Sequence, residues 1–294
     1  MAAPIAVLVA CNALTGASDL EVGGVPVALP DAAPRDSGGD AASAPPPPPP
    51  PAADGGSDAC TLQIPGAPDA SGAITASRAT IAIDGDLSDW ACIPFVHVSP
   101  TSGDLVKPDA ATATLPNTFD FAVSWDDAAI RVAIHVVDAT AEGNADPQHD
   151  FENDSVEIYI DADGVLTGVY GANDHQWIVD HLNQVEVYRW VPGSSLSSPS
   201  ASFASAVRVG NGTIDYEIAI PASDLGMKAL KAGAHVGFDV AANDGDGTAQ
   251  IEQLLWYEAT GCTCVNGCCC NGMGGKTDQP FCDTQRFGAV ILAP

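Results

Sequence analysis

Short segments in which apolar and polar side chains alternate fill the chain from about residue 75 onward. An apolar residue at every second position is typical of a β-strand with one buried face. The clearest apolar sets are Phe119, Phe121, Val123 and Trp125; Ile130, Val132, Ile134 and Val136; Val156, Ile158 and Ile160; Ile214, Tyr216, Ile218 and Ile220; and Val236, Phe238 and Val240. Short strands separated by Gly, Asn and Asp turns, without long helical stretches, predict an all-β fold, an antiparallel β-sandwich.

The N-terminal part of the chain has a different composition. Residues 12–58 are rich in Ala, Gly, Asp, Ser and Pro, and residues 45–51 are all proline. This composition predicts a disordered tether that contains a stiff polyproline II segment. An SH3-type ligand motif is the alternative interpretation of the proline run.

Leu8-Val9-Ala10-Cys11 is similar to a bacterial lipobox, in which the cysteine is lipidated and becomes the mature N-terminus. We therefore expect residues 1–11 to be a signal and lipobox, with the lipid on Cys11. Residues 12–58 would then hold a sandwich domain, residues 59–294, away from the membrane. A chance cysteine in a disordered N-terminus is the alternative.

Charge narrows the range of partners. The chain has 10 Lys and Arg residues against 38 Asp and Glu residues, a net charge of −28. Such a field repels nucleic acids and anionic lipid surfaces, so we expect no nucleic-acid partner and membrane contact only through a lipid anchor. Neutral ligands and cations remain as candidates.

Eight cysteines remain when Cys11 is set aside, an even number that suits disulfides in an oxidising compartment. They are Cys60, Cys92, Cys262, Cys264, Cys268, Cys269, Cys270 and Cys282. We expect Cys60 to pair with Cys92 and the other six to form three bonds. All six lie in a Gly-rich, non-periodic insertion, residues 261–285, where closely spaced thiolates could instead hold a soft metal.

Acidic residues also cluster on Gly-containing turns, at Asp161 and Asp163 and at Asp244 and Asp246. Calcium takes about six to eight oxygen ligands, and carboxylates on tight turns supply several. Structural calcium is therefore the expected cofactor, with plain acidic turns as the alternative. No zinc-ligand spacing, phosphate-binding loop or nucleophile elbow is present in the sequence, which predicts a protein that is not an enzyme. A glycoside hydrolase built on two carboxylates is the enzymatic alternative.

Six motifs in order resemble family 9 carbohydrate-binding modules. They are Ile83-Asp84-Gly85-Asp86-Leu87-Ser88-Asp89-Trp90, Trp125-Asp126-Asp127 with Val137-Asp138, Asn153-Asp154-Ser155-Val156-Glu157-Ile158-Tyr159-Ile160-Asp161, Tyr216-Glu217-Ile218-Ala219-Ile220-Pro221, Gly237-Phe238-Asp239 with Asn243-Asp244, and Arg286-Phe287-Gly288. The similarity covers about residues 77–294. It implies a distorted jelly-roll sandwich that is non-catalytic, binds sugars and carries structural calcium.

The resemblance also implies a ligand site. The family holds a terminal sugar between two aromatic rings and binds its hydroxyls with a glutamate, an amide and basic groups. The first aromatic corresponds to Phe151 and the glutamate to Glu157. The basic position falls near Ile178 and the amide position near Ala241, so the polar set is incomplete. The second aromatic wall falls in the 261–285 insertion, which has no Trp.

Three further residues are candidate ligand contacts: Gln176, Trp177 and Trp256. Trp90 and Trp125 are expected to pack in the core or in turns. The function that we predict is binding of glycan, or of a related neutral ligand, by an exported domain, lipid-anchored at the cell surface or secreted. The alternative is a surface lipoprotein with a structural or interaction role that has lost sugar binding.

Overall fold

The computed structural model describes residues 72–105, 118–145, 149–167, 170–189, 198–257 and 284–294. The expected lipobox and tether and the 261–285 insertion, up to residue 283, lie outside these residues. Within the described segments the regular elements are strands and three short 3-10 turns. None of the described helical turns has the length and apolar character that a membrane-spanning helix needs.

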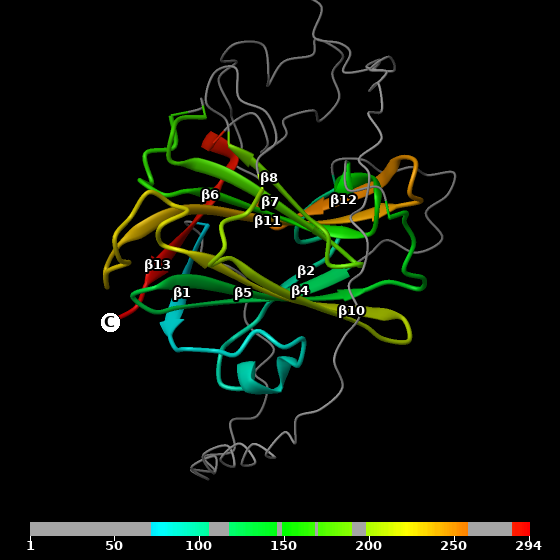
Figure 1. Cartoon of the computed structure of the whole chain (residues 1–294), viewed down its shortest axis with the longest axis horizontal. Coiled ribbons are helices and arrows are strands. Elements are labelled where there is room, and N and C mark those ends of the chain that lie inside the picture. Colours follow the sequence, from blue (N-terminus) through cyan, green and yellow to red (C-terminus); the bar gives the residue numbers. More distant parts are fainter. Residues whose placement is uncertain (1–71, 106–117, 146–148, 168–169, 190–197, 258–283) are drawn as a thin grey trace, which may run out of the picture. The chain divides into compact units, whose positions relative to one another are not determined.

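The strands form two layers (Figure 1). Layer A contains β3 (Asp104–Leu105), β6 (Ser155–Asp161), β7 (Asp174–Asp180), β8 (Val185–Arg189), β11 (His235–Gly245), β12 (Gln250–Leu255) and β13 (Gly288–Leu292). Layer B contains β2 (Val96–Val98), β4 (Thr118–Trp125), β5 (Ala129–Val137), β9 (Ala204–Val209) and β10 (Thr213–Pro221). The 3-10 turns are η1 (Leu87–Trp90), η2 (Asp150–Glu152) and η3 (Thr284–Arg286).

β1 (Ala73–Arg78) joins the two layers. Its first four residues pair with β13 of layer A and its last two residues pair with β4 of layer B, both in parallel. The other strand pairs are antiparallel, in the order β8-β7-β6-β11-β13-β1-β4-β5-β10-β9. The predicted antiparallel β-sandwich is therefore confirmed, with β1 as the strand that crosses between its layers.

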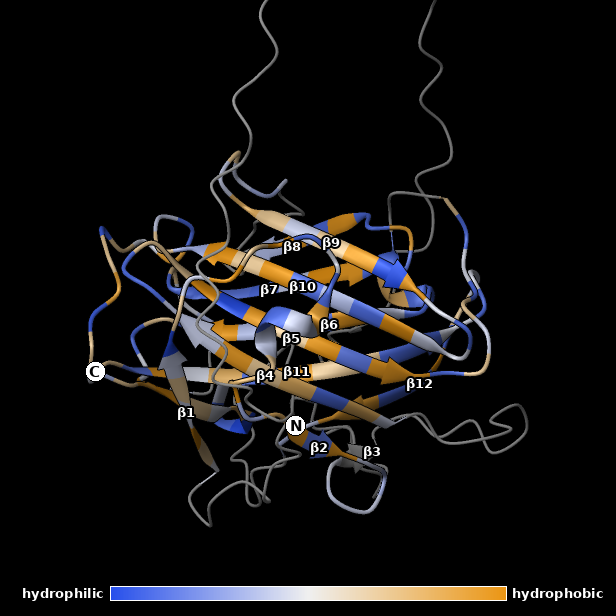
Figure 2. Cartoon of the chain, turned by 90° about the horizontal axis from the view of Figure 1, so that it is seen from below, coloured by the Kyte–Doolittle hydropathy of each residue, from blue (hydrophilic) through white to orange (hydrophobic). Residues whose placement is uncertain are grey.

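The core lies between the layers and contains the alternating apolar residues of β4, β5, β6, β10 and β11. Figure 2 shows the corresponding bands of apolar and polar positions along β4, β5 and β10. Aromatic rings from both layers meet at its centre: the centroid of Phe121 on β4 lies 6.1 Å from that of Phe238 on β11 and 5.2 Å from that of Trp256. Contacts of this kind add to the burial of apolar area and fix how the two layers face each other.

The outer face of layer B is also covered, by the segment that carries the first sequence motif. Trp90 of η1 packs with Ile81, Ile93 and Phe95 over Ala122 and Ala133 of the sheet. The buried Glu217 carboxylate of β10 accepts hydrogen bonds from Trp90 Nε1 at 2.7 Å and from the backbone N–H groups of Gly85 and Asp84. As expected, Trp90 and Trp125 are fully buried packing residues.

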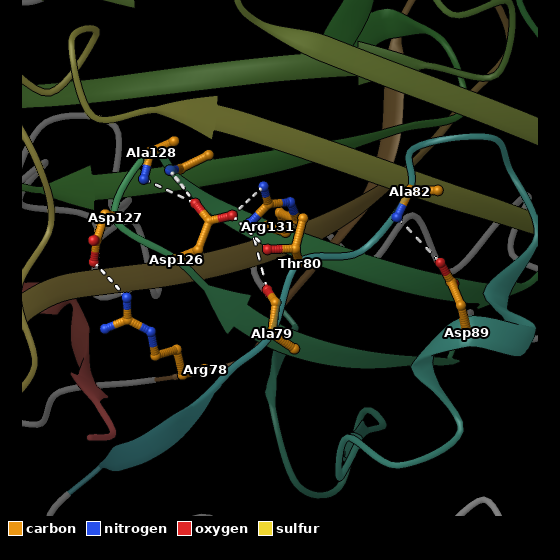
Figure 3. A network of polar contacts seen from close by, with 10 residues as sticks. Arg78, Ala79, Thr80, Ala82, Asp89, Asp126, Asp127, Ala128 and Arg131 are labelled. Carbon is orange, nitrogen blue, oxygen red and sulfur yellow. Dashed lines mark hydrogen bonds and ion pairs between the residues drawn. The ribbon is translucent and has the colours of Figure 1, made fainter. Parts of the chain in front are cut away.

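A second set of polar contacts fixes the second motif at one end of layer B (Figure 3). Asp126 accepts from Arg131 at 2.8 Å and from the Thr80 hydroxyl at 2.9 Å, while Arg78 forms an ion pair with Asp127 at 2.8 Å. Burial raises the pKa of Asp126, but the hydrogen bond from Arg131 and those from its other donors outweigh it and lower the pKa to about 2. These two motifs therefore stabilise layer B.

Replacing Glu217 by alanine is expected to cost about 3 kcal/mol of folding free energy, because it leaves three donors, one of them the buried Trp90 indole, without an acceptor. Urea unfolding of the variant measures the loss. The matched control is Asp215→Ala, a partly exposed carboxylate on the same strand whose ion pair with His135 should contribute less than about 1 kcal/mol. Equal losses in the two variants would contradict the role of Glu217.

Candidate ligand-binding face

Successive residues of β6 point to opposite sides of layer A. Val156, Ile158 and Ile160 enter the core, so Glu157 and Tyr159 lie on the outer face of layer A. The register places Glu157 opposite Ile178 of β7 and opposite Ala241 of β11. The three positions that the family resemblance connects with the sugar hydroxyls therefore form one row across adjacent strands.

A cluster of polar side chains surrounds Glu157, which is only 2% exposed. Its Oε2 accepts from Gln176 Nε2 at 2.6 Å and from the Tyr159 hydroxyl. Its Oε1 accepts from Asn243 Nδ2 at 2.7 Å and from Gln253 Nε2 at 3.2 Å. These five residues, from β6, β7, β11 and β12, are called the Glu157 cluster below. It binds four strands together through one carboxylate.

Apolar side chains border the Glu157 cluster on the same face. Tyr159, Tyr170, Ala241, Leu255 and Phe287 pack together, with the rings of Tyr159 and Tyr170 lying 5.8 Å and 6.0 Å from that of Phe287. Ile178 and Ala241 are 1% and 0% exposed. The family's basic and amide positions are thus occupied by buried apolar residues. The amide side chains of Gln176 and Asn243 lie two residues away from them on the same strands.

Phe151 lies on η2, which contacts β6, β7, β11 and β12. Its ring is partly exposed and meets the exposed His149 edge-on, with centroids 5.7 Å apart. His149 has a φ of 70°, an uncommon backbone conformation for a residue with a side chain. The buried Glu186 carboxylate holds it there by accepting its backbone N–H at 2.7 Å, together with the N–H of Asp150.

The structure brings three of the predicted ligand residues, Phe151, Glu157 and Gln176, to the outer face of layer A. It corrects the prediction for the other two. Trp177 is 0% exposed and Trp256 is 3% exposed, and both belong to the core between the layers. Trp177 and Val179 are two residues apart on β7 and therefore lie on the same side of the sheet. Both enter the core, so the Trp177 ring points away from the outer face.

Three carboxylates approach one another at one end of the sandwich. Each of Asp138, Asp154 and Asp244 offers an oxygen that lies within 4.8 Å of the others. Burial, with the negative charges of Asp138 and Asp244, raises the pKa of Asp154 to about 8. Burial and neighbouring negative charges also raise the pKa values of Asp138 and Asp244. A group of this kind supplies hard oxygen ligands to a cation and is costly without one.

Of the four predicted calcium ligands, only Asp244 belongs to this group. Asp161 accepts the backbone N–H groups of Asp163, Gly164 and Leu166. Asp163 accepts Asn173 Nδ2 at 2.9 Å and the N–H of Val165. Asp246 accepts the N–H and hydroxyl of Thr248. Three of the predicted ligands therefore stabilise turns, whereas Asp244 meets Asp138 and Asp154, and calcium binding by any of the four stays a prediction.

Cys92 is disulfide-bonded. The other eight cysteines lie outside the described residues, so the expected pairing with Cys60 and the bonds within the insertion stay predictions.

Comparison with known proteins assigns the chain to a family. A family model described as "Carbohydrate family 9 binding domain-like" matches residues 101–294. The chain belongs to this family. Two curated relatives are much longer proteins, and the chain spans only 16–17% of their length. They are an "Exoglucanase XynX" from Acetivibrio thermocellus, 28% identical over 74% of this chain, and an "Endo-1,4-beta-xylanase A" from Thermotoga neapolitana, 30% identical over 63% of it.

Solved structures agree with the fold. A family 9 carbohydrate-binding module from Caldicellulosiruptor kristjanssonii, solved in complex with cellotriose, superposes with a TM-score of 0.53 and 19% identity, covering 75% of this chain and 93% of the other. The same module solved with glucose gives the same TM-score, covering 95% of that chain. At this identity the likeness establishes the fold.

Sequence reasoning missed Asn243 and Gln253 of the Glu157 cluster, and Asp138 and Asp154 of the carboxylate group. Asn243 is two residues from Ala241 on β11 and therefore lies on the same face of the sheet, a spacing from which it could have been predicted. Gln253 lies in Gln250–Leu255, where polar and apolar residues do not alternate, so no pattern predicted that strand.

Proposed function

We propose that this family 9 domain is a non-catalytic module that binds neutral glycan on the outer face of layer A. The observation that carries the proposal is the position of Phe151, a partly exposed aromatic ring on the turn that crosses the strands of the Glu157 cluster. Aromatic rings suit the apolar face of a pyranose, and carboxylates and amides suit its hydroxyls. The structural relatives crystallised with cellotriose and glucose support this ligand class.

A second function has a specific observation in its favour. Ile178 and Ala241 replace the polar residues that the family resemblance implies, and Glu157 already accepts four hydrogen bonds from the protein. These features fit a sandwich that keeps the fold for a structural or interaction role and no longer binds sugar. The relatives with enzyme names extend far beyond the matched region, and we infer no catalytic role for the domain itself.

A glycan array followed by calorimetry with glucose and cellotriose separates these functions. If the proposal holds, the full chain binds a neutral glycan, and Phe151→Ala weakens binding by about 1–3 kcal/mol, by analogy with stacking of bases on aromatic rings. The control is Phe203→Ala, a partly buried aromatic packed against the core, which should leave the affinity of the folded protein unchanged. Absence of binding to every glycan would favour the structural role.

We also propose that Asp138, Asp154 and Asp244 hold a calcium ion. The mutual approach of their oxygens and the raised pKa of each carboxylate support this, because a cation would offset the repulsion among them. They would supply part of the ligand set of about six to eight oxygens. The ion would connect the end of β5 with β11 and the segment before β6.

Calcium should raise the thermal midpoint relative to chelator, with about 2.7 kcal/mol of added stability at a concentration about 100 times the dissociation constant. Asp244→Asn should abolish this gain. The matched control is Asp246→Asn, two residues away, whose carboxylate is bonded to Thr248 and which should keep the gain. A calcium response that survives Asp244→Asn would place the ion elsewhere.

We further propose that the protein is exported and lipid-anchored through Cys11, or secreted. The lipobox-like Leu8-Val9-Ala10-Cys11 and the polar tether support an anchor, and the disulfide at Cys92 suits an oxidising compartment. Metabolic labelling with a fatty-acid probe should mark the wild type and not Cys11→Ala. Equal labelling of both would rule out Cys11 as the lipid site.

A further inference from the structure

The Glu157 carboxylate dictates how the amides around it are oriented. An ionised carboxylate accepts hydrogen bonds and cannot donate them. Gln176, Asn243 and Gln253 must therefore turn their NH₂ groups toward Glu157, as the structure shows. Each planar amide then directs its carbonyl oxygen away from Glu157. The amide carbonyl oxygens of the cluster are therefore the acceptors that it directs away from Glu157.

One of these carbonyl oxygens is buried without a hydrogen-bond donor. Asn243 Oδ1 accepts from Gln250 Nε2 at 2.8 Å, but Gln253 Oε1 is buried and has no hydrogen-bond partner among the residues that the structure describes. Gln253 as a whole is 2% exposed. A buried carbonyl without a donor destabilises the closed arrangement relative to one in which a ligand hydroxyl donates to it.

The unpaired oxygen lies on the same face as the aromatic ring of the proposed site. Gln253 of β12 is opposite Asn243 of β11, next to the row that contains Ala241 and Glu157. η2, which carries Phe151, contacts both β11 and β12. Gln253 thus belongs to the proposed site. It differs from the basic position near Ile178 and from the amide position near Ala241 that the family resemblance implies.

We propose that the carbonyl oxygen of Gln253 accepts a hydrogen bond from a ligand hydroxyl, and that the site thereby selects neutral sugars over anionic ones. The inference rests on the proposed glycan binding and specifies its chemistry. A sugar hydroxyl supplies the missing donor when the face opens to ligand. A uronic acid or a sulfated sugar brings negative charge close to Glu157 in a chain with a net charge of −28, so it binds more weakly.

Gln253→Met tests the role of the carbonyl, because methionine has similar length and no polar atom. With cellotriose or glucose in calorimetry, whichever the wild type binds more tightly, we expect affinity to fall roughly two- to tenfold, as for the loss of one neutral hydrogen bond. The thermal midpoint of the free variant should change little, since the substitution removes a buried unpaired oxygen and also the hydrogen bond from Nε2 to Glu157, and these two effects oppose each other. A purely structural Gln253 would instead lower the midpoint and leave the affinity of the folded variant unchanged, which would overturn the proposal.

Ser124→Ala is the matched control. Within the described part of the chain the Ser124 hydroxyl is also buried without a hydrogen-bond partner, but it lies on β4 of layer B. Its removal should leave affinity unchanged. An equal loss of affinity in Ser124→Ala and Gln253→Met would show a general effect of repacking and would overturn the assignment to Gln253.

A measurement on the wild type keeps the proposal testable if Gln253→Met does not fold. Glucose and glucuronate at neutral pH and low salt should differ in affinity by about tenfold or more, in favour of glucose. Equal or tighter binding of glucuronate would overturn the selectivity. Absence of binding to both glucose and cellotriose, and to every sugar on the array, would overturn the proposed function itself. Binding that is insensitive to Gln253→Met overturns only the present inference.

Discussion

A carboxylate removed from water needs donors for about four lone-pair sites, and a buried one therefore determines the positions of the groups around it. Each layer of this sandwich has such a carboxylate on its outer face. Glu217 holds the Trp90 segment against layer B, and Glu157 holds side chains from β6, β7, β11 and β12 in layer A. The core fixes how the layers face each other, and these two groups fix what lies outside them.

The strands that sequence reasoning predicted best are those with one apolar and one polar face. β4, β5, β6, β10 and β11 have apolar residues at every second position, and those residues enter the core. β12 escaped prediction because it is buried on both sides, so its outward residues, Gln253 and Leu255, are one polar and one apolar. A period of two in hydropathy is lost when the outer face of a sheet is covered as well.

The candidate site could be predicted only where local sequence decides the chemistry. The family resemblance assigned Phe151 and Glu157 to a ligand site, and both lie on the outer face of layer A. Trp177 was misassigned because an indole near a motif suggests ligand contact until it is known which face of the strand it occupies. The acidic turns show the same limit. Asp161 and Asp244 both stand near the end of a strand, next to an acidic turn that contains Gly, yet one accepts backbone amides of that turn and the other meets Asp138 and Asp154 from distant segments. Sequence spacing does not distinguish these outcomes, because the partners of Asp244 are brought together only by the tertiary fold.

The departures from the family pattern at Ile178 and Ala241 have a simple geometric consequence. The amides nearest to them on their own strands are Gln176 and Asn243, each two residues away. A move of two residues keeps a side chain on the same face of a sheet and displaces it by about 7 Å along the strand. The two strands run antiparallel to β6, and one move is toward the N-terminus while the other is toward the C-terminus. The polar groups therefore move in opposite directions, Gln176 toward Tyr159 and Asn243 toward Ser155, and Glu157 is the one group that still reaches both. The face is retained while its centre becomes apolar, so hydrogen bonding to a ligand would have to come from the neighbouring row, where Gln253 lies opposite Asn243.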